Sequence, residues 1–222
     1  MALYLGLLIF SFIITAILII PFIDLLYKLR LQRRDEAKAA KSNGSQETPI
    51  FHKLHAAKAG TPVGGGLLII LIVSLLYTIL FPLISFLGVY VSAIYPVKDE
   101  LNILFFSFLS FGFLGLYDDL MKSFGLASQG IFGLRLRHKF FLQWILAFTI
   151  ALMLYQNLKI NFVHVPFWGV VPLGIWYIPF AAFVIVAFTN AFNITDGLDG
   201  LASGLLVICL VALLVINSSL DQ

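Results

Sequence analysis

The sequence contains little of what a water-soluble protein needs. Only 11% of its 222 residues are charged, against about a quarter in a typical soluble domain, whereas 61% are hydrophobic and 22 are Phe. This shortage of charge excludes a soluble globular domain, and the shortage of polar residues excludes a disordered chain. A single cysteine, Cys209, excludes a disulfide scaffold, and a formal net charge of +3 is too small to indicate a nucleic-acid partner. The class that remains is an integral membrane protein.

Six apolar runs are candidates for membrane-spanning segments. They are continuous rather than alternating, which indicates helices, because a helix needs roughly 20 apolar residues to cross a bilayer. The runs cover residues 2–23, 63–86, 101–117, 140–158, 173–192 and 201–218. The sequence therefore predicts an all-α, polytopic membrane helical bundle with six transmembrane helices, forming a single domain over residues 1–222.

The basic residues predict the orientation of this bundle. Twelve of the fourteen Lys and Arg residues fall in the segments between spans one and two and between spans three and four. Basic loops stay in the cytoplasm, so both termini are expected on the outer side. Residues 31–50 are polar and are expected to form a mobile cytoplasmic loop.

Two adjacent carboxylates, Asp118 and Asp119, follow the third apolar run at its predicted cytoplasmic end. A carboxylate at the border of a membrane is unfavourable, and two neighbouring ones repel each other, so a divalent cation or a basic side chain should compensate them. Lys122 lies three residues further on. The pair is a candidate catalytic or metal site, although a helix cap that touches solvent would leave the same pattern.

A second polar cluster lies in the segment NAFNITDGLDGLASG, residues 190–204. Asn190, Asn193, Asp196 and Asp199 recur every three residues, and in a straight helix such a series turns through about half a circle. The nearby glycines predict a helix break near Asp196 that lets these groups face one cavity. Amide and carboxylate oxygens suit Mg²⁺, whereas a polar loop with capping residues is the alternative.

A third cluster is HKLHAAKAGTPVGGG, residues 52–66. Its glycines begin the second span, where free backbone N–H groups beside Lys58 could receive an anion, although glycines also allow close helix packing. His138 and Lys139 belong to a basic patch that should face phosphates. Together the three clusters predict phosphoryl transfer at the inner membrane surface.

The segments KAGTPVGGG, GLYDDLMK and NAFNITDGLDGLASG, in this order, closely resemble the polyprenyl-phosphate N-acetylhexosamine-1-phosphate transferases, glycosyltransferase family 4. Within that superfamily the chain is most similar to the phospho-N-acetylmuramoyl-pentapeptide transferases. The resemblance implies that phospho-MurNAc-pentapeptide moves from UDP-MurNAc-pentapeptide to undecaprenyl phosphate, a membrane lipid, giving lipid I and UMP. It also implies Mg²⁺ as cofactor and an active site on the cytoplasmic face of a bacterial inner membrane.

The resemblance assigns roles to the matching positions. It implies catalytic Asp118, Asp119 and Asp196, with one aspartate acting as base or as covalent nucleophile, an alternative that the sequence leaves open. It places Lys58, Lys122 and Lys139 on phosphates, Asn190 and Asp199 at the nucleotide end, and Asn193 with Asp196 on the metal.

The chain also departs from the family pattern. Family members usually have about ten spans, a later Met-Gly-Asp type motif and a histidine-rich cytoplasmic loop, none of which follows here. The chain is therefore expected to correspond to the N-terminal part of the enzyme and to be inactive or nearly so by itself. Three alternatives remain open: a UDP-GlcNAc:polyprenyl-phosphate GlcNAc-1-phosphate transferase, a small membrane transporter, and a non-catalytic remnant that binds UDP-sugar or a partner. The sequence leaves the oligomeric state open, a homodimer included.

Overall fold

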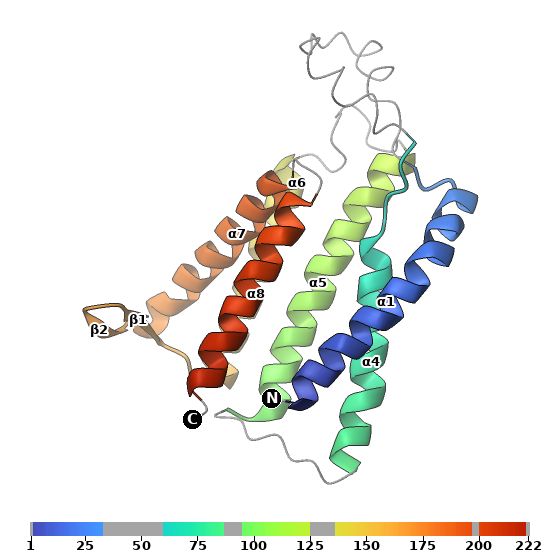
Figure 1. Cartoon of the computed structure of the whole chain (residues 1–222). Coiled ribbons are helices and arrows are strands. Elements are labelled where there is room, and N and C mark those ends of the chain that lie inside the picture. The colour runs from blue at the N-terminus through green and yellow to red at the C-terminus, as the bar shows by residue number, and fades with distance from the viewer. Residues whose placement is uncertain (1, 33–59, 87–94, 125–135, 197–199, 221–222) are drawn as a thin grey trace. The chain divides into compact units, whose positions relative to one another are not determined.

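The part of the chain that the structure describes is folded mostly into helices, which confirms the all-α class. The structure, a computed structural model, describes residues 2–32, 60–86, 95–124, 136–196 and 200–220 (Figure 1). The long helices in these ranges are α1 (Ala2–Lys28), α4 (Gly66–Phe86), α5 (Val97–Phe124), α6 (Leu136–Asn157), α7 (Tyr177–Thr195) and α8 (Leu201–Leu220). Each of the six apolar runs thus overlaps one of these helices. Most of the polar loop expected at residues 31–50 lies outside the described ranges.

Four of these helices are long and apolar enough to cross a membrane. They are the segments Leu8–Lys28, Val97–Met121, His138–Asn157 and Gly174–Thr195, and the described parts of α4 and α8 add the shorter apolar stretches Gly66–Ile79 and Leu201–Ile216. The protein is therefore a helical membrane protein. Six spans with both termini outside stay a prediction.

Several helices run further than the apolar runs predict. α1 continues to Lys28, α5 continues past the aspartate pair to Phe124, and α6 begins at Leu136. In each case the added residues carry charge, because a helix keeps its backbone hydrogen bonds when it leaves the apolar layer while hydropathy falls there. The charged side chains of interest consequently sit on helix ends.

A small β-hairpin connects α6 to α7. Its strands β1 (Phe162–Val165) and β2 (Gly169–Pro172) pair antiparallel, with Val165 opposite Gly169 and Phe162 opposite Pro172. The short 3₁₀ helix η2 (Gly174–Trp176) then leads into α7. The sequence predicted only a short connection here.

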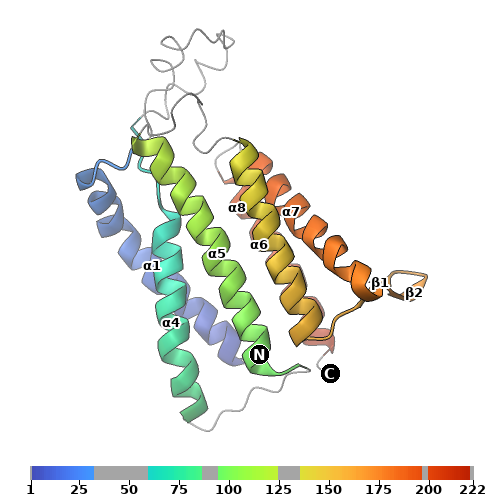
Figure 2. The same ribbon diagram turned by 180° about the vertical axis from the view of Figure 1, so that it is seen from behind.

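The chain divides into two compact units, which are described separately. The larger comprises Gly6–Leu142, in which α4 and α5 pack side by side and antiparallel (Figures 1 and 2). The rings of Tyr77 and Phe105 are in contact, with centroids 4.4 Å apart and planes tilted by 45°, and Ile70 lies against Gly112. The chain after α1 is tied to the approach to α4, because the N–H of Val63 donates to the carbonyl of Leu31 over 2.9 Å.

The smaller unit comprises Gln143–Gln222 with Met1–Leu5. Here α6 packs on α7 through small side chains, since Ala147 and Ala151 of α6 are fully buried with Ala182 of α7 in one cluster. Small residues let two helices approach closely, which is how membrane helices commonly associate. α8 returns along α7 after the break near Asp196.

Candidate functional site

The paired aspartates lie in the last two turns of α5. Asp118 is buried, with 4% of its surface exposed, and Asp119 is half-buried. The helix continues for more than a turn after them. Asp118 is therefore not a solvent-facing helix cap, the alternative that the sequence had left open.

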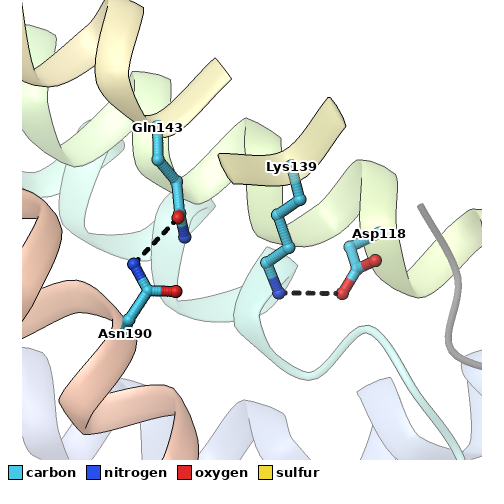
Figure 3. Close-up of polar contacts among 4 residues, drawn as sticks. All are labelled: Asp118, Lys139, Gln143 and Asn190. Atoms are coloured by element: carbon cyan, nitrogen blue, oxygen red, sulfur yellow. Dashed lines mark hydrogen bonds and ion pairs between the residues drawn. The ribbon is translucent and has the colours of Figure 1, made fainter. Parts of the chain in front are cut away.

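Lys139 compensates the buried carboxylate. Its Nζ donates to Oδ2 of Asp118 over 3.2 Å, and the two side chains are 19% and 6% exposed (Figure 3). A buried carboxylate is tolerated when a cation and hydrogen bonds accompany it. A lysine ammonium has three donors, and this contact uses one, so the same group can also hold a phosphate oxygen.

Local spacing had suggested Lys122 as a partner of the aspartates, and the structure describes a further one on another helix. Lys122 lies in α5 close to the aspartates in sequence, but the described contact of Asp118 comes from α6, 21 residues away. The side chain of Lys122 is outside the described part of the structure. The same holds for Lys58, which falls in the undescribed segment 33–59.

The glycine run lies at the same end of the larger unit as the aspartates. From the Tyr77–Phe105 contact to the Ile70–Gly112 contact, α4 steps back by seven residues while α5 advances by seven. Counting six more residues back from Ile70 and six more forward from Gly112 brings Gly64 near the level of Asp118. Gly64 has φ +95°, a left-handed conformation that only glycine adopts without strain.

The backbone donors at the start of α4 are partly used. The N–H groups of Leu67 and Leu68 donate to the carbonyls of Gly64 and Gly65 over 3.0 and 3.1 Å. These two groups are thus closed to an anion, which limits the predicted anion site to the residues before them.

The helix break predicted near Asp196 is confirmed. α7 ends at Thr195 and α8 begins at Leu201, with Gly200 at φ +83°. Asp196 caps α7 through its N–H, which donates to the carbonyl of Phe192 over 3.1 Å. Asn193 and Asp196 are both exposed at this end, one helical turn apart, whereas Asp199 lies outside the described residues.

Asn190 is fixed by two hydrogen bonds, and one of its partners was not predicted from the sequence. Its Nδ2 donates to Oε1 of Gln143 over 3.0 Å and to the carbonyl of Val186 over 2.8 Å (Figure 3). Gln143 is 2% exposed. The sequence did indicate that Gln143 has a partner, because an amide side chain within an apolar stretch of a membrane span needs one.

The side-chain orientation of Asn190 follows from this geometry. The backbone carbonyl of Val186 accepts only, so the amide nitrogen must point toward it, and Gln143 must present its oxygen to the second N–H. Both donors are used, which leaves Oδ1 of Asn190 as the group that a ligand could reach. Gln143 and Lys139 are four residues apart in α6, so this one helix supplies a partner to both Asn190 and Asp118.

The residues available for a metal are few but chemically suitable. Within the described ranges no group of three or more His, Cys, Asp or Glu side chains is positioned to hold an ion. Asn193 and Asp196 offer an amide and a carboxylate oxygen on neighbouring turns of α7. Mg²⁺ fits such a set, because it usually takes one or two carboxylates and completes its shell with water and substrate phosphates.

Comparison with known proteins shows which protein family the chain matches. Residues 101–222, more than half of the chain, match the family model of glycosyl transferase family 4. A phospho-N-acetylmuramoyl-pentapeptide-transferase of Thermodesulfovibrio yellowstonii is 37% identical over 161 residues, which cover 69% of this chain and 39% of that protein. One of Clostridium perfringens (strain SM101) is 34% identical over 213 residues, covering 96% and 57%, and one of Clostridioides difficile is 36% identical over 168 residues, covering 75% and 47%. The chain thus spans about half the length of these curated relatives.

Proposed function

Since this chain belongs to glycosyl transferase family 4, we propose that it takes part in the transfer of phospho-MurNAc-pentapeptide from its UDP carrier to undecaprenyl phosphate, with release of UMP. The observation that supports this most is the buried Asp118 held by Lys139 at the end of α5. A membrane protein has little reason to keep such a pair unless the carboxylate acts, because apolar side chains of similar size would be at least as stable.

The aspartate pair supplies the reacting carboxylate. Asp118 either accepts the proton of the lipid phosphate or attacks the donor phosphorus, with Asp119 beside it. The Lys139 ammonium holds the Asp118 carboxylate in place, and its remaining donors hold a phosphate oxygen. Lys58 and Lys122 contribute further positive charge to the two phosphate groups.

The end of α7 binds the nucleotide part of the donor. Asn190 presents Oδ1 to the donor, and Asp199 lies in the same motif. Asn193 and Asp196 would hold Mg²⁺ there. When bound, this ion would neutralise the diphosphate and stabilise the charge on the departing UMP.

The reaction takes place at the inner surface of a bacterial membrane. This placement follows from the basic loops, which the positive-inside rule keeps in the cytoplasm, where the soluble UDP donor is found.

A chimera tests the proposal. The 213 matched residues of the Clostridium perfringens relative are replaced by this chain, and lipid-linked product and UMP are measured in membranes. We expect turnover in the chimera and little or none from the 222-residue chain alone. We expect Asp118→Asn to lower the chimera's turnover by about 10²–10⁴-fold, the range for loss of a general base.

Asp99→Asn is the matched control, because Asp99 lies in the first turn of the same helix. It should leave turnover unchanged. UDP-GlcNAc as the donor in a parallel reaction distinguishes the two sugar specificities. Full UMP release by a folded Asp118→Asn chimera would disprove the role of the aspartate.

A further inference from the structure

The β-hairpin between α6 and α7 contains no charged residue. From Ile160 to Thr195 the sequence contains no Asp, Glu, Lys or Arg. The hairpin joins two helices that can each cross a membrane, His138–Asn157 and Gly174–Thr195. Its strands are four residues long, or about 13 Å, so the tip can lie only a short distance from the ends of these two helices (Figure 1).

Aromatic side chains at the tip and in the following η2 are largely exposed. Phe167 is 105% and Trp168 is 85% exposed, and Trp176 in η2 is 74% exposed. In water such side chains are unfavourable, and a loop that faces water normally carries charge instead. Trp is, in contrast, enriched where the apolar layer of a bilayer meets its headgroups.

The backbone of the tip places Phe167 where glycine is the usual residue. The N–H of Trp168 donates to the carbonyl of Val165 over 3.1 Å, closing a turn with Pro166 second and Phe167 third. Phe167 has φ +70°, a left-handed conformation that favours Gly or Asn. The chain therefore keeps a bulky ring at the tip in spite of both exposure and backbone strain.

We propose that this hairpin is an interfacial membrane anchor. Phe167 and Trp168 insert into the boundary between lipid headgroups and acyl chains, with the indole N–H turned toward the headgroups. Lipid fits better than a second copy of this chain, because two aromatic side chains bury a few hundred Å² at most. A stable protein interface needs about 1,200 Å² or more.

Single-tryptophan fluorescence tests the anchor independently of any catalytic role. The chain has three Trp residues, so Trp144→Phe with Trp176→Phe leaves Trp168 as the only indole. The full chain is reconstituted into phosphatidylcholine vesicles that contain lipids brominated at shallow or deep acyl positions. We expect blue-shifted emission and at least twofold stronger quenching by the shallow bromines than by the deep ones.

A second variant separates anchoring from a structural role. Phe167→Gly relieves the strained backbone, so it should keep or raise thermal stability while it lowers quenching of Trp168 by the bromolipids. Two results would overturn the proposal. One is emission from Trp168 typical of water, quenched by iodide and not by bromolipids; the other is blue-shifted emission that no bromolipid quenches, which would mean a protein contact.

Discussion

The buried carboxylate of Asp118 forms an ion pair with Lys139. We predict that Lys139→Met lowers the free energy of unfolding in detergent by roughly 3 kcal/mol, because it removes this cation from a buried carboxylate. Asp118→Asn combined with Lys139→Met should recover most of this loss. Denaturation followed by circular dichroism measures both.

Lys98→Met is the matched control for Lys139→Met, since Lys98 is exposed in the first turn of α5. It should change the free energy of unfolding by less than about 0.5 kcal/mol. A Lys139→Met protein that is as stable as this control would show that the ion pair does not contribute to the fold.

A second prediction at the residue scale concerns Gln143. Gln143→Leu removes the acceptor of one Asn190 N–H inside the protein, so we expect a loss of about 1–3 kcal/mol in stability. The same change at Gln156, an exposed residue of α6, is the control and should be nearly neutral. In the transferase chimera Gln143→Leu should also weaken donor binding, seen as a higher KM, because the amide of Asn190 is then oriented by its bond to Val186 alone.

At the scale of helices, α4 and α5 meet at a glycine. A Cβ added to Gly112 would lie 2.7 Å from Cδ1 and 3.1 Å from Cγ1 of Ile70, which is itself buried. We predict that Gly112→Ala destabilises the larger unit, because overpacking costs about 1–3 kcal/mol and exceeds the roughly 1 kcal/mol gained in helix propensity. Thermal unfolding of the purified protein measures the difference.

Gly115 provides the control for this contact. It lies one turn further along α5 with nothing within 4 Å of an added Cβ, so Gly115→Ala should be neutral or stabilising. Ile70→Val removes the nearest carbon and should rescue Gly112→Ala. If the two alanine variants behave alike, the close contact between α4 and α5 does not exist in solution.

The elements differ in how much of them the sequence predicts. Apolar runs locate the six long helices in the described ranges, and the glycines around Asp196 predict the break between α7 and α8, because both signals are local. The hairpin was missed because two four-residue strands with a proline in the turn show no long alternation. The apolar runs placed helix ends incorrectly wherever charged residues form the last turns of a helix.

The sequence predicts which types of residue form the candidate site, but not which residues contact one another there. Motif spacing identifies Asp118 and Asn190, but their partners lie on α6, 21 and 47 residues away in the sequence. Such contacts depend on how helices pack, which hydropathy does not encode. Local spacing therefore suggested Lys122, which stays a prediction, but it identified neither Lys139 as the partner of Asp118 nor Gln143 as the partner of Asn190.

At the scale of the whole molecule, the distribution of charge predicts which segments face the cytoplasm. Twelve of the fourteen basic residues lie in two segments, so the positive-inside rule places residues 33–59 inside and the hairpin outside.

A variant with Cys209→Ser provides a cysteine-free background, since the chain has one cysteine. His164→Cys in the hairpin should then react with a membrane-impermeant maleimide in intact cells, whereas Lys38→Cys should react only after lysis. Both should be labelled equally in detergent, which controls for intrinsic reactivity. Labelling of Lys38→Cys in intact cells would reverse the orientation and would separate the aspartate pair from the soluble UDP donor.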